Sequence, residues 1–394
     1  MKARVAWADM WARHSAEWRD TAQVASQWRE AAAVDSELLA SRASGNWWDT
    51  LESSGMTLFV TREYEHLVMA LSARDNKRRV TYFPLPHPSG LTTDRKSGRL
   101  FVASSRNPNQ VFTFQPAIGA LKRKDVRTAP DRGSPLVPVW SAFYPGCLYL
   151  HDLALVGDAL YGNAAGHNAI VRLEADGTYQ RVWWPKCIET TDGPAFDRNY
   201  IQLNSIAAGG TLKDSYFSAS SAEIGRQRPG HLNYRVDGRG VILSGHSREP
   251  ICRGLTRPHS ARLHKKRVWV ANSGYGEVGY ADQGRLTVAR RLSGWTRGLC
   301  LTSDVIFVGT SRVIPRFAHY APGVQSTRSR CGVHAICRRT GAVLGSIEWP
   351  AGNQIFAIDW MPTDITVGFP FGPRSRNRRR ETTFFYSYSI DSTT

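Results

Sequence analysis

Apolar and polar residues alternate along this chain in short segments, and the same succession of segments returns several times. Alternation over about four to eight residues that include many β-branched and aromatic side chains is typical of strands. Six segments combine a turn with a following apolar strand: 87–94, 150–157, 202–209, 258–265, 295–302 and 354–361. The first five each lead into a second strand that ends in small or polar residues, as in "GRLFVASS" and "KRVWVANS". Repetition of one unit predicts a repeat architecture.

The sixth of these first-strand segments has no second strand after it, because the chain soon reaches an Arg-rich end. The missing pattern stands near the other end, in "MTLFVTREYEHLVMAL" (56–71), which has no first-strand segment before it. An N-terminal segment that completes the last module closes a ring of blades, and closure removes exposed sheet edges. We therefore predict an all-β fold, a six-bladed β-propeller over residues 46–370. A seventh blade remains an alternative if a divergent module lies within 110–145 or 176–200.

The two flanks of the predicted ring differ from it in composition. Residues 1–45 are rich in Ala, Glu, Arg and Trp and predict a helical extension, in which Trp7, Trp11, Trp18 and Trp28 form a stripe on one face. We expect the stripe to pack on the side or base of the propeller; a helix that binds a protein partner is the alternative. Residues 371–394 form a basic tail with five Arg, which predicts disorder.

Composition narrows the class of protein. The 34 Gly and 20 Pro among 394 residues favour a turn-rich β protein. The formal net charge of +18 favours anionic partners, but no nucleic-acid recognition motif accompanies it, so nucleic acid is not an expected partner. No run of 18 apolar residues exists, so no membrane span is expected, and the N-terminus lacks the apolar core of a signal peptide. We expect a cytoplasmic protein.

The six cysteines include one closely spaced pair, in "CGVHAIC". On a strand, Cys331 and Cys337 would share one face while His334 points to the other, which is a poor geometry for a three-ligand metal site. We expect buried thiols in a reducing compartment.

The candidate site follows from the predicted fold. In a propeller the first strand of each blade lines the central channel, and the loops that precede these strands share one face with the loops between second and third strands. Aligning the six first-strand segments places one residue of each blade at the channel mouth: Ser89, His151, Asn204, His259, Arg297 and Ile355. His87 and Gln354 stand next to this ring.

Histidines in this ring suggest a metal. Neutral imidazoles that point at a common axis can bind a divalent or transition metal. Together, His151, His259 and His87 would form a three-histidine site with positions open for substrate or water. The alternative is a structural ring whose histidines bind backbone groups and a channel water.

Arginines from the loops suggest an anion. Those expected around the funnel are Arg62, Arg106, Arg257, Arg297 and Arg312. Guanidinium groups bind carboxylate, phosphate or sulfate in bidentate fashion, which predicts a small anionic ligand or the anionic group of a larger one. The alternative is that these arginines brace loops through carbonyl groups. Asp152 is the only acid at the ring positions, so paired-carboxylate chemistry is not indicated.

Two family resemblances accompany these motifs. The stretch "HPSGLTTDRKSGRLFVASSRNPNQVF" resembles the repeats of NHL and gluconolactonase-type propellers, whose lactonases hold an axial divalent metal with acidic and Asn ligands. This chain has Asn204 but carries histidines and an arginine where acids would be needed. The ordered series "LHDLAL", "RPHSARLHKKRVWVANSGYGEVG", "GWTRGLC" and "NQIFAIDW" resembles, over residues 46–362, a bacterial conserved-hypothetical family with some members joined to tetratricopeptide repeats. That resemblance implies the fold and the interest of His151, Asp152, His259 and Arg297, without a reaction.

The leading hypothesis is a propeller that binds a small anionic or polar ligand in its axial funnel. If it is an enzyme, the catalytic candidates are His151, Asp152 and Arg297: a metal held by His151 and His259 would polarise substrate or activate water or dioxygen, and Arg297 would hold the anionic group. The alternative is a non-catalytic scaffold that presents its top face or its N-terminal helix to a protein partner.

Overall fold

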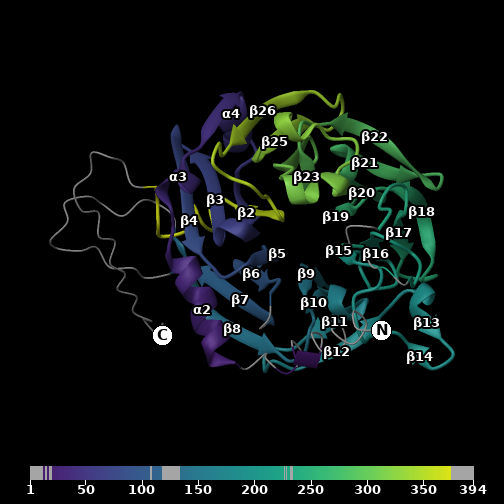
Figure 1. Cartoon of the computed structure of the whole chain (residues 1–394). Coiled ribbons are helices and arrows are strands. Elements are labelled where there is room, and N and C mark those ends of the chain that lie inside the picture. Colours follow the sequence, from purple (N-terminus) through teal and green to yellow (C-terminus); the bar gives the residue numbers. More distant parts are fainter. Residues whose placement is uncertain are drawn as a thin grey trace.

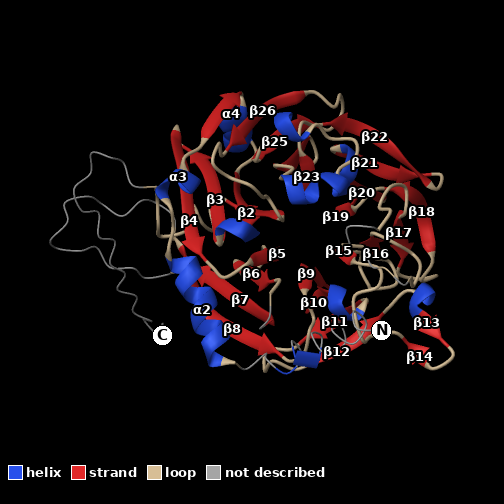
Figure 2. Cartoon of the chain, viewed as in Figure 1, coloured by secondary structure: helices blue, strands red, loops and turns tan. Residues whose placement is uncertain are grey.

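Six antiparallel sheets stand around a central axis in the computed structural model (Figure 1). The model describes residues 12–13, 16, 20–106, 109–117, 134–225, 227, 229–230 and 234–373. Strands dominate, and the few helices lie at the periphery and in the connecting loops (Figure 2). The chain is a six-bladed β-propeller, which confirms the predicted fold.

The blades follow the order of the chain, and the strands of each blade are named from the innermost to the outermost. Blade 1 consists of β27 (Ile358–Pro362), β2 (Met56–Arg62), β3 (Leu67–Arg74) and β4 (Lys77–Pro84). Blade 2 consists of β5 (Pro88–Asp94), β6 (Arg99–Ser104), β7 (Asn109–Pro116) and β8 (Leu136–Tyr144). Blade 3 consists of β9 (Leu150–Val156), β10 (Ala159–Ala164), β11 (Ala169–Leu173) and β12 (Tyr179–Trp183).

Blades 4 to 6 repeat the arrangement. Blade 4 consists of β15 (Leu203–Ala207), β16 (Tyr216–Ala219), β17 (Gly240–Ser244) and β18 (Pro250–Leu255). Blade 5 consists of β19 (Pro258–His264), β20 (Arg267–Asn272), β21 (Glu277–Asp282) and β22 (Arg285–Arg291). Blade 6 consists of β23 (Trp295–Leu301), β24 (Val305–Ser311), β25 (Gly332–Cys337) and β26 (Val343–Glu348), extended at its outer edge by β1 (Arg42–Gly45).

The ring closes within blade 1. Strand β27, from the C-terminal part of the chain, pairs with β2, from the N-terminal part, with Val60 opposite Ile358 and Met56 opposite Pro362. Residues 176–200, one of the two alternative locations for a seventh blade, hold only the end of blade 3 and a small hairpin, β13 (Glu189–Thr190) and β14 (Gly193–Pro194). The described part of 110–145 belongs to blade 2.

Apolar side chains fill the space between neighbouring blades, and polar groups join the blades near the axis. The faces of blades 1 and 2 enclose Phe59, Phe112 and Phe114, all buried. The hydroxyl of Thr61 donates to the Ser89 carbonyl at 2.6 Å, and the Ser89 hydroxyl donates to the Leu150 carbonyl at 2.7 Å, so that one hydrogen bond follows another from blade 1 to blade 3. These contacts hold the inner strands, and therefore the residues at the channel mouth, in fixed relative positions.

The N-terminal segment is only partly helical. It contains α2 (Thr21–Ala32) and α3 (Ser36–Leu39), followed by β1 and by α4 (Trp47–Ser53). The prediction of helix up to residue 45 is therefore wrong for 42–45, because these residues pair with the outer edge of β26. Trp28 on α2 packs edge-on against Phe112 at 5.8 Å between ring centroids, whereas Trp7, Trp11, Trp18 and the tail after residue 373 lie outside the described residues.

Short 3-10 helices occupy several loops: η2 (Glu63–Glu65), η3 (Ala165–His167), η4 (Lys186–Ile188), η5 (Ser273–Tyr275), η6 (Pro315–Tyr320) and η7 (Ser326–Arg328). Within the described residues, no helix combines the length and the apolar character needed to cross a lipid bilayer.

Candidate functional site

A cavity of about 390 Å³ lies at one end of the propeller axis. Counted over the described residues, its wall holds three arginines, one carboxylate, one histidine and six aromatic residues. The charged and imidazole groups are Arg106, Arg257, Arg297, Glu63 and His151. The aromatic residues are Tyr64, Tyr149, Trp295, Phe317, Tyr320 and Phe356. The funnel is thus rich in positive charge and in flat apolar surface.

Backbone geometry before the inner strands directs several of these side chains. Tyr149, Gln202 and Arg257 each stand one residue before an inner strand, and each has a positive φ of 47° to 54°. A left-handed residue at this point reverses the chain from the preceding loop into the strand. All three line the cavity. His87 holds the same position before β5, with φ 43°, but it does not line the cavity.

Arg297 is one of the two buried arginines described in the funnel wall. Its guanidinium carbon lies 4.4 Å from the ring centroid of Trp295 and 4.8 Å from that of Phe356. With its amide oxygen turned toward Arg297, Gln354 accepts a hydrogen bond from Nη1 at 2.5 Å and donates one to Glu63 at 3.2 Å. Nε of Arg297 is buried and has no hydrogen-bond partner among the described residues. Burial lowers the pKa of Arg297, while the field of Glu63 opposes that shift.

The other two arginines stand around the same opening. Arg257 is buried, donates to the side-chain oxygen of Gln202 at 2.7 Å and stacks over Tyr320 at 4.2 Å. Arg106 is exposed, and its Nε lies 3.8 Å from a carboxylate oxygen of Glu63. Three guanidinium groups therefore share the funnel with one carboxylate, which leaves an excess of positive charge.

Two histidines and Phe356 form the inner end of the site. The rings of His151 and His259 stand 6.2 Å apart, and Phe356 contacts both, at 5.6 and 5.1 Å between centroids. Burial, followed by the field of Arg297, lowers the pKa of His151 to about 3 and holds that of His259 well below its usual range. Both imidazoles are therefore neutral near pH 7. Within the part of the chain that the structure describes, His151 Nδ1, His259 Nε2 and Asn204 Oδ1 are buried without a hydrogen bond of normal geometry.

The structure brings together four of the predicted site residues and separates the rest. Arg106, His151, Arg257 and Arg297 line the cavity. His259 lies beneath it, against His151. Arg312 is exposed and borders a smaller adjoining hollow.

Two further predicted residues serve as structural ties. The Ser89 hydroxyl donates to two carbonyls, those of Ala103 and Leu150. Asn204 donates to the Pro258 carbonyl at 2.9 Å. Each joins neighbouring strands or blades, and neither lines the cavity.

Arg62 and Asp152 are both buried, and neither lines the cavity. Arg62 donates to the carbonyl of Leu38 at 2.6 Å and lies over Trp349, so it braces α3 against the propeller. Asp152 binds Arg262 at 2.7 Å, and so its carboxylate is held by another blade and does not face the funnel. The interpretation of Asp152 as a catalytic group does not fit this placement.

The predicted three-histidine arrangement does not form either. His87 packs against His66 at 4.3 Å between ring centroids, instead of joining His151 and His259. Among the described residues, Glu30, His66 and His87 are the one group of three metal-ligand side chains whose donor atoms lie within 4.8 Å of one another. The ring of His87 lies against His66 at the β2–β3 loop, although its left-handed backbone matches that of Tyr149, Gln202 and Arg257, whose side chains line the cavity.

Sequence reasoning missed the aromatic wall. Alignment of the first-strand segments indicates Ile355 at the channel mouth, but Ile355 is buried in the core beside Trp47, and its neighbour Phe356 occupies the axis. Phe317 and Tyr320 come from the irregular β24–β25 loop, which has no strand periodicity to reveal their position. The high aromatic content is the only sequence signal of this surface.

The fold and the funnel together define a six-bladed propeller with a cationic, aromatic-walled axial site. Within that class the chain belongs to the family described as Domain of unknown function (DUF4915), whose model matches residues 45–367. The resemblance to a propeller family without an assigned function is thereby confirmed. None of the curated proteins compared matches the sequence.

Similarity to solved structures concerns the fold. A chain of the nidogen/laminin complex has a TM-score of 0.51 at 8% identity, covering 77% of this chain and 98% of that one. Virginiamycin B lyase from Staphylococcus aureus has a TM-score of 0.40 at 12% identity, covering 78% and 99%. Regucalcin from Agrobacterium tumefaciens has a TM-score of 0.40 at 11% identity, covering 66% and 73%.

Proposed function

We propose that the axial funnel binds a small organic anion that has a planar, aromatic body. The observation that carries the proposal is Arg297, a buried guanidinium with an unpartnered Nε at the wall of an open cavity. A buried cation whose hydrogen-bonding capacity is not filled gains most from a charged acceptor. Arg257 and Arg106 on the same wall add to the attraction for an anion.

The aromatic residues determine the expected body of the ligand. Tyr64 and Phe317 are stacked with 14° between their planes, and Phe317 and Tyr320 with 24°. A cavity wall made of such rings favours a flat apolar group, while nearby guanidinium groups fix its acidic end. The dimensions suit a small molecule, since ligand pockets have volumes of about 300–1,000 Å³.

The same charges bear on the hypothesis of an axial metal. Arg297 and Arg257 act on His151 through their positive fields. These fields disfavour a metal cation between the axial histidines and favour an anion at their rim. We therefore propose that His151 and His259 serve the funnel as neutral hydrogen-bonding groups. We further propose a reducing, cytoplasmic location, which is supported by the six cysteines standing as free thiols.

Calorimetric titration tests the function. The probes are phenylacetate and phenyl phosphate, with phenylacetamide as the neutral control and acetate as the control without a ring. We expect the two aromatic anions to bind and both controls to bind at least about tenfold more weakly. Phenylacetamide lacks the charge, and one charge-assisted hydrogen bond contributes about 1.5–3 kcal/mol. Acetate keeps the charge but lacks the ring that would pack on the aromatic wall.

A matched pair of variants locates the binding. Arg297→Gln removes the buried charge and should weaken phenylacetate binding at least about tenfold. Arg312→Gln removes an exposed charge outside the cavity and should bind like the native chain. Equal loss in both variants, or binding of phenylacetamide as tight as that of phenylacetate, would show that the funnel is not an anion site.

A further inference from the structure

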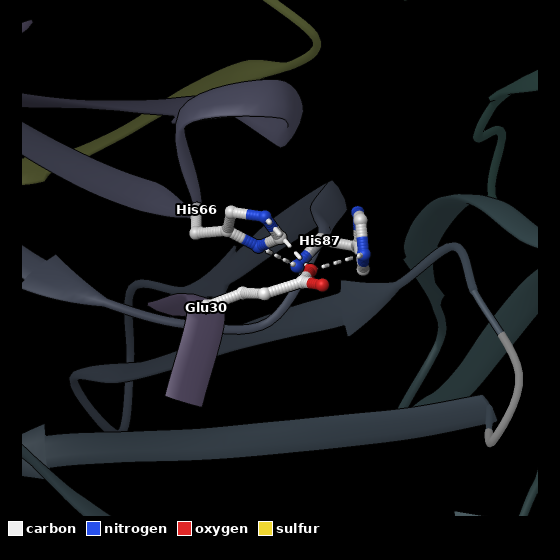
Figure 3. Close-up of side chains that lie close together, drawn as sticks. All are labelled: Glu30, His66 and His87. Carbon is white, nitrogen blue, oxygen red and sulfur yellow. Dashed lines mark hydrogen bonds and ion pairs between the residues drawn. The ribbon is translucent and has the colours of Figure 1, made fainter. Parts of the chain in front are cut away.

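Three side chains with metal-binding atoms meet at a second place on the molecule (Figure 3). Glu30 comes from α2, His66 from the loop after η2 between β2 and β3, and His87 from the loop between β4 and β5. A carboxylate oxygen of Glu30 lies 3.7 Å from Nε2 of His66 and 4.0 Å from Nε2 of His87. The three segments are separate in the sequence. Their side chains therefore meet only when the propeller has folded and α2 lies on it.

We propose that Glu30, His66 and His87 bind one divalent transition-metal ion, Zn²⁺ in the first instance, and that the ion fastens α2 to the propeller. Two imidazole nitrogens and one carboxylate oxygen form a donor set that such ions accept, with the remaining position open to water. Mg²⁺ and Ca²⁺ prefer oxygen ligands and fit this donor set poorly.

The spacing of the donor atoms supports a bridging ion. Separations of 3.7 and 4.0 Å exceed hydrogen-bond length, so Glu30 faces both imidazoles without bonding either directly. With metal–ligand bonds of about 2.0–2.2 Å, the ligand atoms of a tetrahedral site stand roughly 3.3–3.5 Å apart. A shift of Glu30 by a few tenths of an ångström would bring its carboxylate to that distance from each imidazole, and the donor atoms of the two imidazoles themselves lie within 4.8 Å of each other. Glu30 can make this shift, because its side chain is 59% exposed.

The local charges also suit a cation. The side chains of His66 and His87 are only 14% and 18% exposed, whereas that of Glu30 is 59% exposed. Glu63 and Glu65 join Glu30 in acting on His66, and Arg106 opposes them. Three carboxylates act on His66, although Arg62 pairs with Glu65 at 3.6 Å and Arg106 also acts on His87, whereas the charges beside the axial histidines are arginines.

One existing bond would have to change. The backbone N–H of His87 donates to Nδ1 of His66 at 3.1 Å, which places the proton of the neutral His66 ring on Nε2. A metal on Nε2 moves that proton to Nδ1, and the hydrogen bond from His87 is lost. The site thus loses one neutral hydrogen bond and gains three metal–ligand bonds. Because the N–H of His87 loses its acceptor, metal binding should speed hydrogen–deuterium exchange of the amides in the β4–β5 loop.

The test uses the full chain, treated with EDTA and titrated calorimetrically with Zn²⁺ at pH 7.5. We expect one Zn²⁺ per chain, with affinity at least tenfold lower in Glu30→Gln, His66→Asn and His87→Asn. Asn is chosen because it tolerates the left-handed backbone of both histidines, with φ 55° and 43°. The controls are Glu37→Gln on α3 and the exposed His246→Asn, which should bind like the native chain.

A second measurement separates a metal site from a merely structural contact. Zn²⁺ should slow proteolytic cleavage between residues 20 and 40 in the native chain and leave the cleavage of Glu30→Gln unchanged. Glu30 is exposed and lies outside the sheets, so this variant is expected to fold even if a histidine variant does not. Native-like Zn²⁺ binding by Glu30→Gln, absence of Zn²⁺ binding in the native chain, or loss of binding only in a His151→Asn/His259→Asn variant would each overturn the proposal.

Discussion

The carboxylate of Asp152 on β9 binds the guanidinium of Arg262 on β19, two blades further around the ring, with contacts of 2.7 and 3.2 Å. Between them the backbone N–H of Ile206, on the inner strand of blade 4, donates to the same carboxylate at 3.0 Å. One acid therefore connects three consecutive blades. Asp359 on β27 has a similar position in blade 1, where it accepts from the backbone of Thr93 and binds Arg95.

The first prediction concerns this connection. Asp152→Asn should lower the free energy of unfolding by about 2–4 kcal/mol, because Arg262 would be left as a largely buried charge without its partner. Urea denaturation followed by far-UV circular dichroism measures the change. Asp364→Asn serves as the control, because its ion pair with Arg74 is exposed and should contribute no more than about 1 kcal/mol. A similar small change in both variants would contradict a stabilising role for Asp152.

The second prediction concerns pH. The pKa of His151 is lowered to about 3 in the folded protein, whereas in the unfolded chain it is about 6.5. Below pH 6.5 the unfolded chain therefore binds a proton that the folded protein does not, and stability falls as pH falls toward 3. Between pH 6.5 and 5 the native chain should lose about 1–2 kcal/mol more than His151→Asn.

Urea titrations at several pH values measure this difference. His246→Asn removes an exposed histidine and should follow the native curve over the same range. If His151→Asn keeps the full native pH dependence, the axial imidazole is not held neutral by its surroundings.

The third prediction concerns thiol reactivity. Hydrogen bonds from Thr340 lower the pKa of Cys337, whereas burial raises the pKa of Cys187 and Cys252 to about 11 and that of Cys331 to about 12. Because the thiolate is the nucleophile, iodoacetamide at pH 8 should alkylate Cys337 first in the folded chain. Peptide mass spectrometry identifies the order. Modification of Cys331 at the same rate would mean that the segment just before β25 opens readily and would contradict the prediction.

The fourth prediction concerns ring closure. A chain that ends at residue 353 lacks β27 and should lose its cooperative thermal transition, because β2 would then form an open edge and blade 1 would lose its inner strand. Circular dichroism and size-exclusion chromatography measure the melting and the association state. A chain that ends at Pro373 keeps β27 and should melt like the native protein. Native melting of the shorter chain would show that closure contributes little.

The strand pattern is sufficient to predict the blades. Each of the six first-strand segments contains or overlaps an inner strand, and "MTLFVTR" forms β2 opposite β27. Such a prediction depends on periodicity and succession along the chain, which are local properties. Local periodicity does not predict which side chains face the axis, because the inner strands contain register shifts. Examples lie between His259 and Arg262 and between Thr296 and Leu299. An irregularity of one residue reverses which side chain faces the axis. Before β27, the N–H of Thr61 donates to the Ala357 carbonyl while its carbonyl accepts from the N–H of Phe356, so that two residues oppose one, and the aligned segments indicate Ile355 instead of Phe356.

By itself, the sequence determined the propeller, its closure by the two ends of the chain, and a funnel that contains Arg106, Arg257, Arg297 and His151. Only the tertiary structure decided the partners of the remaining polar groups. In the folded chain Asp152 forms an ion pair with Arg262, and His87 lies beside His66 and Glu30. These partners are too far apart in the sequence for a motif to reveal them. The physical reason is that a repeat specifies which strands neighbour each other, whereas register shifts within strands and contacts between distant segments specify where each side chain points.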